Sequence, residues 1–196
     1  MMRTPKILLF LFISCLCFGC QSSLRRESRI EKQDDVYVLS FANLSFSVSA
    51  GKGGRIVSFK CEDRELLTSD SVHSKYYGAT FWLSPQSEYW PQYQCVDELP
   101  YQAEIDKQIL RLVSPPDSIS GVSVTKEFSI SERDSSILIH YSVRNVSRQL
   151  KRLAPWDVTR VYGGLSFFPV GETDRMNKSD VTGGYEDKGM VWVPCP

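Results

Sequence analysis

Histidine is scarce in this sequence, and of its six cysteines the three that follow residue 20 are not grouped. Only His73 and His140 occur among 196 residues, too few for a histidine-rich metal site. Cys61, Cys95 and Cys195 lie far apart and form no CxxC pair and no cluster with histidine at zinc-ligand spacing. We therefore expect no metal site and no cofactor. At most one disulfide can form among these three cysteines, and the sequence leaves open which pair would form it.

A net charge of either sign is also missing. The chain has 23 acidic and 23 basic residues, so its formal net charge is zero. A protein without a net positive field does not attract the phosphate backbone, and we expect no nucleic-acid binding. No apolar period of 3.6 residues persists over about ten residues, which argues against long amphipathic helices.

The N-terminus has the features of a bacterial signal peptide. Arg3 and Lys6 precede an apolar run over residues 7–19, which is shorter than the roughly 20 residues that a membrane-spanning helix needs. Residues 16–20 (LCFGC) resemble the lipobox of bacterial lipoproteins, with the leucine one position further from the cysteine than usual. We expect cleavage before Cys20 and lipidation of that cysteine. An ordinary signal peptide and an uncleaved anchor are the alternatives.

These features divide the chain into three parts. Residues 1–19 are the expected signal peptide, residues 20–35 a polar linker, and residues 36–196 one folded domain. We expect an exported, lipid-anchored protein of the bacterial cell envelope, on the outer-membrane, periplasmic or cell-surface side.

The folded part alternates apolar and polar residues with the period of a β-strand. Residues 43–50 alternate in this way, and a glycine-rich turn over residues 51–54 leads into a strand at residues 55–60, which predicts a hairpin. Residues 122–130 and 136–145 predict a second hairpin. Further strands are expected at residues 109–113, 152–159, 165–168 and 190–193. Many short strands without helices predict an all-β antiparallel sandwich or barrel.

One segment breaks this pattern. Residues 76–101 are rich in aromatic residues and proline and do not alternate, which predicts a long ordered loop. Trp82 and Trp90 offer flat faces for stacking on sugar rings, and Gln86 offers hydrogen bonds to hydroxyls. The alternative is that the aromatic residues only cover the open end of the sandwich. We expect this for Trp82 and leave both roles open for Trp90.

Several short motifs resemble one fold family. Residues 53–59 (GGRIVSF), followed by residues 64–67 (RELL), resemble the opening hairpin of the galactose mutarotase-like (aldose 1-epimerase-like) β-supersandwich. Further motifs resemble more particularly its DUF4380 branch: residues 81–86 (FWLSPQ), Trp90 with Pro91, and residues 154–159 (APWDVT) with Gly163 and Gly164. The resemblance covers about residues 43–171. It implies an antiparallel supersandwich with a concave, sugar-binding sheet.

The sequence departs from this family in two ways. Supersandwich domains are usually longer, and this chain stops at an expected strand, so the resemblance implies that C-terminal strands are missing. Mutarotation opens a hemiacetal ring, which needs a general base for the anomeric hydroxyl and an acid for the ring oxygen. In the family these are a glutamate from the C-terminal strands and a histidine. Here the strand that would carry the histidine has Trp156 and Asp157 instead.

Two residues remain as weak catalytic candidates. His140 lies on the polar face of its expected strand, and its neighbour Tyr141 lies on the apolar face. A partly exposed structural histidine is the simpler explanation of His140. Asp157 is suited to act on sugar hydroxyls, but an aspartate bonded to the backbone at a strand end explains it equally well. Arg160 is a candidate contact to hydroxyls, although a solvated arginine is the simpler explanation.

The leading hypothesis is an envelope lipoprotein with a carbohydrate-binding sandwich that is not catalytically competent as given. Its expected partners are a mono- or oligosaccharide and, through the lipid anchor, a membrane. The expected sugar contacts are Trp82, Gln86, Trp90, Trp156, Asp157 and Arg160. The alternatives are a sugar epimerase or mutarotase-type enzyme acting on a hexose or related sugar, and a structural envelope module.

Overall fold

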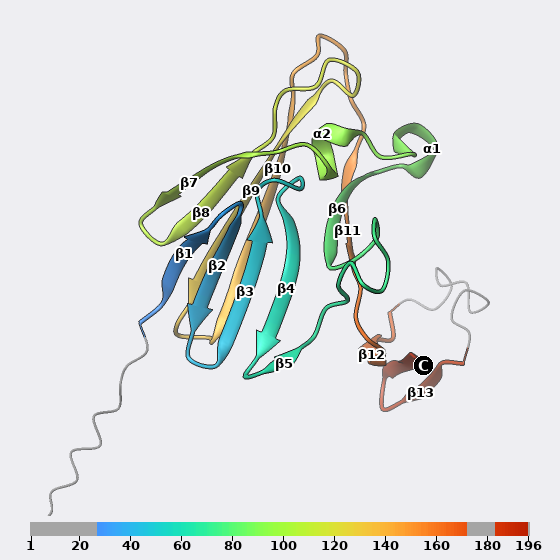
Figure 1. Ribbon diagram of the computed structural model, residues 1–196. Coiled ribbons are helices and arrows are strands. Elements are labelled where there is room, and N and C mark those ends of the chain that lie inside the picture. The colour runs from blue at the N-terminus through green and yellow to red at the C-terminus, as the bar shows by residue number, and fades with distance from the viewer. Residues whose placement is uncertain (1–26, 172–182, 196) are drawn as a thin grey trace, which may run out of the picture.

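The computed structural model describes residues 27–171 and 183–195, which form an antiparallel all-β sandwich (Figure 1). The fold class agrees with the prediction from the sequence. The expected signal peptide and Cys20 lie outside the described residues. No helix in the described part of the chain is both long and apolar enough to cross a membrane.

The larger sheet has the strand order β1-β2-β3-β4-β6-β11, and β5 pairs with β4. Its strands are β1 (Arg29–Gln33), β2 (Val36–Phe41), β3 (Leu44–Ser49), β4 (Arg55–Cys61), β5 (Arg64–Glu65), β6 (Ala79–Ser84) and β11 (Ala154–Thr159). β11 is far from β6 in the chain but pairs with it along its whole length, and this pairing creates the candidate site described below.

The second sheet has the order β10-β9-β8-β7, and a third has the order β12-β14-β13. The strands of the second sheet are β7 (Gln102–Asp106), β8 (Ile109–Val113), β9 (Val122–Ser131) and β10 (Ser136–Asn145). Those of the third are β12 (Gly164–Pro169), β13 (Tyr185–Asp187) and β14 (Met190–Cys195).

Both predicted hairpins are confirmed. β3 and β4 pair from Leu44 opposite Cys61 to Ser49 opposite Arg55, around the glycine-rich turn. β9 and β10 pair over ten residues each around a short polar turn. The strands expected at residues 109–113, 152–159, 165–168 and 190–193 correspond to β8, β11, β12 and β14.

The folded part begins earlier than predicted. β1 falls within residues 20–35, which were expected to be a linker, and it pairs with β2 from Arg29 opposite Ser40 to Gln33 opposite Val36. The side chains of β1 are mostly exposed. An edge strand is held by backbone hydrogen bonds and often has charged side chains, so composition alone did not reveal it.

Residues 76–101 are not a single loop, which corrects the prediction. β6 lies inside this segment, and its first five residues are all buried, so its sequence shows no alternation. Two four-residue helices follow, α1 (Gln86–Tyr89) and α2 (Gln94–Asp97). Both helices lie at the end of β6, and α2 is the one nearer to β9 (Figure 1).

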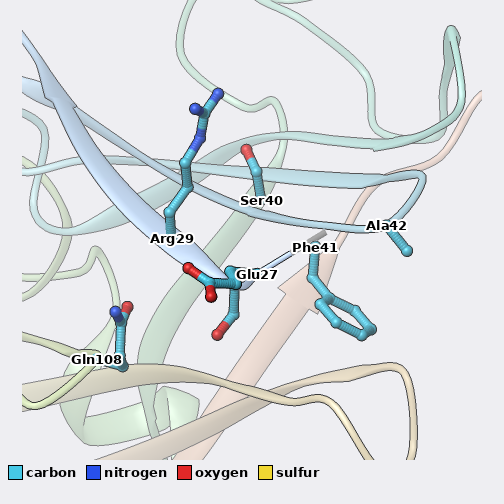
Figure 2. Close-up of a pocket in the computed structure, with 7 residues that line it drawn as sticks. Glu27, Arg29, Ser40, Phe41, Ala42 and Gln108 are labelled. Atoms are coloured by element: carbon cyan, nitrogen blue, oxygen red, sulfur yellow. The ribbon is translucent and has the colours of Figure 1, made fainter. Parts of the chain in front are cut away.

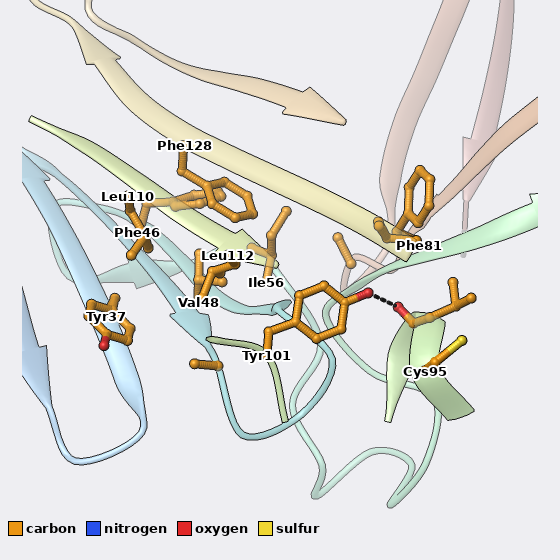
Figure 3. Packing of buried hydrophobic residues seen from close by; sticks show 14 of the residues in the cluster. Tyr37, Phe46, Val48, Ile56, Phe81, Cys95, Tyr101, Leu110, Leu112 and Phe128 are labelled. Carbon is orange, nitrogen blue, oxygen red and sulfur yellow. Dashed lines mark hydrogen bonds between the residues drawn. The ribbon is translucent and has the colours of Figure 1, made fainter. Parts of the chain in front are cut away.

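The core lies between the two main sheets, where alternate residues of facing strands meet (Figure 3). Phe46 and Val48 of β3 point toward Leu110, Leu112 and Phe128 of the second sheet, and all five are buried. The ring centres of Phe46 and Phe128 are 5.8 Å apart. Burying side chains of this size contributes about 1.5–3 kcal/mol each, which makes this interface the main source of stability.

Candidate functional site

Two tryptophans lie directly opposite each other on neighbouring strands. Trp82 of β6 is the register partner of Trp156 of β11, and their ring centres are 5.3 Å apart in an edge-to-face arrangement. Residues two apart in a strand point to the same face, so this pair shares its face with Thr80 and Val158. The face is the one turned away from Phe81, whose ring packs on Tyr141 of the second sheet at 4.6 Å.

A third tryptophan joins this pair from the segment after α1. The ring centre of Trp90 lies 5.1 Å from that of Trp82, again edge-to-face. Trp82 is only 7% exposed, Trp90 is 42% exposed, and Trp156 is half-buried. Trp82 is therefore a buried indole that packs against two more exposed ones.

Arg160 packs on the same group of rings. Its guanidinium carbon lies 5.3 Å from the ring centre of Trp82 and 5.7 Å from that of Tyr76, within the range of a cation–π contact. The guanidinium also donates hydrogen bonds to the hydroxyl of Thr80 at 3.1 Å and to the carbonyl of Val158 at 3.2 Å. Arg160 is thus a packed, half-buried arginine, not a freely solvated one.

Gln92 holds the aromatic segment against β6. Its side-chain oxygen accepts a hydrogen bond from the Leu83 amide at 2.9 Å, and its side-chain nitrogen donates to the Leu83 carbonyl at 3.1 Å. A single glutamine amide therefore satisfies both backbone groups of a buried strand residue. This fixes the residues around Trp90 relative to Trp82.

A buried carboxylate lies beneath the tryptophans. Oδ2 of Asp97 accepts a hydrogen bond from Nε1 of Trp82 at 3.4 Å and forms an ion pair with Arg55 at 2.7 Å. Burial raises the pKa of Asp97, although Arg55 and Lys126 nearby favour its ionised form. Oδ1 of Asp97 is buried and has no hydrogen-bond partner among the described residues.

Lys126 of β9 is the second buried cation near Asp97. Its amine donates to the carbonyl of Gly53 at 2.6 Å and lies 5.4 Å and 5.3 Å from the ring centres of Phe81 and Tyr101. Burial lowers the pKa of Lys126 to about 8, although Asp97 and Asp157 favour the charged amine. The site therefore rests on a dense group of buried charges.

The other predicted contacts do not join this cluster. Gln86 is exposed at the start of α1. Asp157 points to the opposite face of β11 from Trp156, where its carboxylate accepts hydrogen bonds from the hydroxyls of Tyr141 at 3.0 Å and Thr159 at 3.1 Å. Neighbouring residues in a strand point to opposite faces, so Trp156 and Asp157 do not lie on one surface of β11.

His140 and Asp157 do not form an acid–base pair. His140 is the register partner of Glu127, on the face of the second sheet away from the core, and its Nε2 lies 3.2 Å from the hydroxyl of Ser142. Tyr141, the next residue, points the other way and contacts Asp157. The side chain of His140 is exposed on that face.

Sequence reasoning missed three buried charged residues at and near the site, Arg55, Asp97 and Lys126. Each is a charged residue that is at most 5% exposed. Charged residues are rarely buried unless they are paired, and the sequence contains no local signal of such a pairing. Lys126 offers a partial clue, because it stands at an inward position of the predicted strand, between Val124 and Phe128.

A separate hollow lies beside β1 and the end of β2. It has a volume of about 690 Å³, and most of its lining residues are labelled in Figure 2, among them Glu27, Arg29, Phe41 and Gln108. This hollow is open and polar, and none of the predicted site residues lines it. It has the character of a solvated surface depression.

Within the described residues, the thiols and potential metal ligands are not assembled into a site. Cys61 and Cys95 are free thiols, and the side chain of Cys195 lies outside the described part of the structure. Burial raises the pKa of Cys95 to about 11, which keeps this thiol protonated. Residues 27–171 and 183–195 contain no group of histidine, cysteine and acidic residues that could hold a metal ion.

No protein-family model matches this sequence, and no curated protein matches it either. Among solved structures, the chain is similar to 4-alpha-glucanotransferase from Thermococcus litoralis, with 13% sequence identity and a TM-score of 0.37. The similarity covers 61% of this chain and 24% of that enzyme. At this level the likeness carries no argument about the activity of this chain.

Proposed function

We propose that this chain is a carbohydrate-binding envelope lipoprotein, and that Trp90 and Trp156 form its sugar-contacting surface. The observation that carries the proposal is the group of three edge-to-face indoles, in which a buried Trp82 supports two partly exposed neighbours. Rigid, partly exposed aromatic faces offer large contact area at low conformational cost, which suits the apolar faces of pyranose rings.

The polar groups around these rings also suit a sugar. The guanidinium of Arg160 stands beside Trp82 as a hydrogen-bond donor, and Glu98 and Lys75 form an ion pair of 3.3 Å near Trp90. The resemblance of the aromatic motifs to the galactose mutarotase-like branch favours the same class of ligand. The separation of His140 from Asp157 favours binding over catalysis, because general acid–base chemistry needs both groups within reach of the substrate.

The test is a glycan array followed by fluorescence titration of the purified full-length chain. The detergent must not be an alkyl glycoside, since such a detergent would compete for the site. We expect binding of at least one neutral glycan, accompanied by a change in tryptophan emission. Trp90→Ala should weaken this binding roughly two- to tenfold, the loss expected for one aromatic contact.

Phe167→Ala is the matched control, because Phe167 of β12 is 60% exposed and belongs to the third sheet. This variant should bind as the unaltered chain does. Absence of binding to every glycan, or equal affinities of the Trp90→Ala variant and the unaltered chain, would contradict the proposed function.

A further inference from the structure

A small cavity opens between the tryptophans and α2. Its volume is about 30 Å³, which is room for a water-sized group and not for a sugar ring. Tyr76, Trp82, Trp90, Tyr93 and Asp97 are among the residues that line it. The cavity thus combines aromatic walls with the carboxylate of Asp97, a residue that is 5% exposed, and the ion-paired Lys75 and Glu98 also line it.

The carboxylate has an unused acceptor. Oδ2 of Asp97 is occupied by Arg55 and Trp82, while Oδ1 is buried and has no partner among the described residues. A buried charged oxygen without a hydrogen bond is costly, and most such groups in folded proteins are satisfied by a protein atom, a water or a ligand. A hydrogen-bond donor entering the cavity would remove this cost.

We propose that this cavity binds the exocyclic hydroxymethyl group of a neutral hexose, whose hydroxyl donates to Oδ1 of Asp97 while the ring stacks on Trp90. The inference rests on the proposed function, and it names the sugar class that the site selects. A hydroxymethyl group extends one carbon beyond the ring, so it reaches into a cavity that excludes the ring itself. Ring hydroxyls are attached directly to the ring and project less far.

The charges around the cavity favour a neutral donor. A uronate has a deprotonated carboxylate in place of the hydroxymethyl group, so it has no proton to donate to Oδ1 of Asp97 and would bring its negative charge against that oxygen. A cationic amine is disfavoured because Arg55 and Lys126 already lie beside Asp97. A hydroxyl donates to the carboxylate without adding charge.

The experiment compares parent sugars with analogues that lack only this hydroxyl. Methyl glycosides of glucose, galactose and mannose are titrated into the full-length chain beside their 6-deoxy and uronic acid counterparts. We expect each parent that binds to do so roughly ten- to a hundredfold more tightly than its 6-deoxy analogue, the effect of one hydrogen bond to a charged acceptor. The uronic acid should bind at least as weakly as the 6-deoxy sugar.

Two variants locate the effect at Asp97. Asp97→Asn should reduce the preference for the parent over the 6-deoxy sugar, whereas Glu104→Gln, which removes an exposed carboxylate of the second sheet, should retain it. The ligand series decides the matter even if Asp97→Asn folds poorly, because it uses the unaltered chain.

The outcomes separate the two proposals. If no sugar binds, the proposed function fails and this inference fails with it. If sugars bind and Trp90→Ala weakens them, but parent and 6-deoxy sugars bind equally, the proposed function stands and the hydroxymethyl cavity is refuted.

Discussion

Replacing Asp97 by asparagine is expected to destabilise the fold strongly, because it leaves two buried cations without their carboxylate. The Arg55–Asp97 ion pair is 2.7 Å long, and the two side chains are only 5% and 7% exposed. Removing one partner of a buried pair costs about 3–5 kcal/mol, since the remaining charge stays in a poorly solvated site. Typical domains have an unfolding free energy of about 5–15 kcal/mol, so this loss is a large fraction of the total.

The assay is urea denaturation at pH 7, followed by far-UV circular dichroism. Tryptophan emission is unsuitable, because Trp82 bonds directly to Asp97 and its signal would change with the substitution itself. The double variant Arg55→Met with Asp97→Asn should lose less stability than the sum of the two single variants, by about 1 kcal/mol or more. Removing both charges leaves no unpaired arginine.

Glu104→Gln is the matched control. Glu104 pairs with Arg111 at 3.2 Å, but these side chains are 63% and 49% exposed. An exposed pair contributes about 0–1 kcal/mol, so the control should change the unfolding free energy by no more than this. A loss in Asp97→Asn no greater than that in Glu104→Gln, or strict additivity in the double variant, would refute the reasoning.

Three further predictions concern other parts of the chain. Gly53 has a φ of +63°, and a Cβ there would collide with the backbone of Asp97. Gly53→Ala should therefore lower the unfolding free energy by more than the roughly 1–2 kcal/mol that left-handed strain alone costs. Gly189→Ala, at a φ of +75° in open space, should cost only the strain in the same urea assay, and equal losses would contradict the collision. Burial lowers the pKa of Lys126 to about 8 in the folded chain, from its ordinary value of 10.5. Between these two pH values the amine is more often protonated in the unfolded chain than in the folded one. The contribution of Lys126 to the unfolding free energy therefore rises with pH over this window. The unfolding free energy of the unaltered chain should therefore rise relative to that of Lys126→Met over this window, by on the order of 3 kcal/mol at most, and parallel pH profiles would show the prediction to be wrong. Cys20→Ala should release the protein from the membrane fraction and abolish incorporation of labelled fatty acid; continued labelling would refute the lipobox interpretation.

The strand pattern was predictable because it depends on local burial. In β3, β9 and β10 one face packs on the core and the other faces solvent, so apolar residues recur with period two. The turns between these strands carry the glycines and polar residues that such turns require. β6 was not predicted because its residues are buried on both faces, and β1 was not predicted because its side chains are mostly exposed, so neither strand alternates.

The membership of the site was predictable only in part. Trp82, Trp90 and Trp156 were identified from their residue type, and the structure brings all three together. Asp157 was also an expected sugar contact, yet the pleat of β11 turns it to the face opposite Trp156. Once residues 152–159 are recognised as a strand, the alternation of side chains along it predicts that Trp156 and Asp157 point to opposite faces.

The sequence by itself determined the all-β class, both hairpins and the aromatic character of the candidate site, because these follow from local periodicity, turn chemistry and residue type. Only the tertiary structure decided that β11 pairs with β6, that Asp97 lies under Trp82, and that Arg55 and Lys126 surround this carboxylate. These contacts join residues distant in the chain. They depend on which strands become neighbours and on a burial energy that the whole core supplies, and neither is encoded in any short stretch of residues.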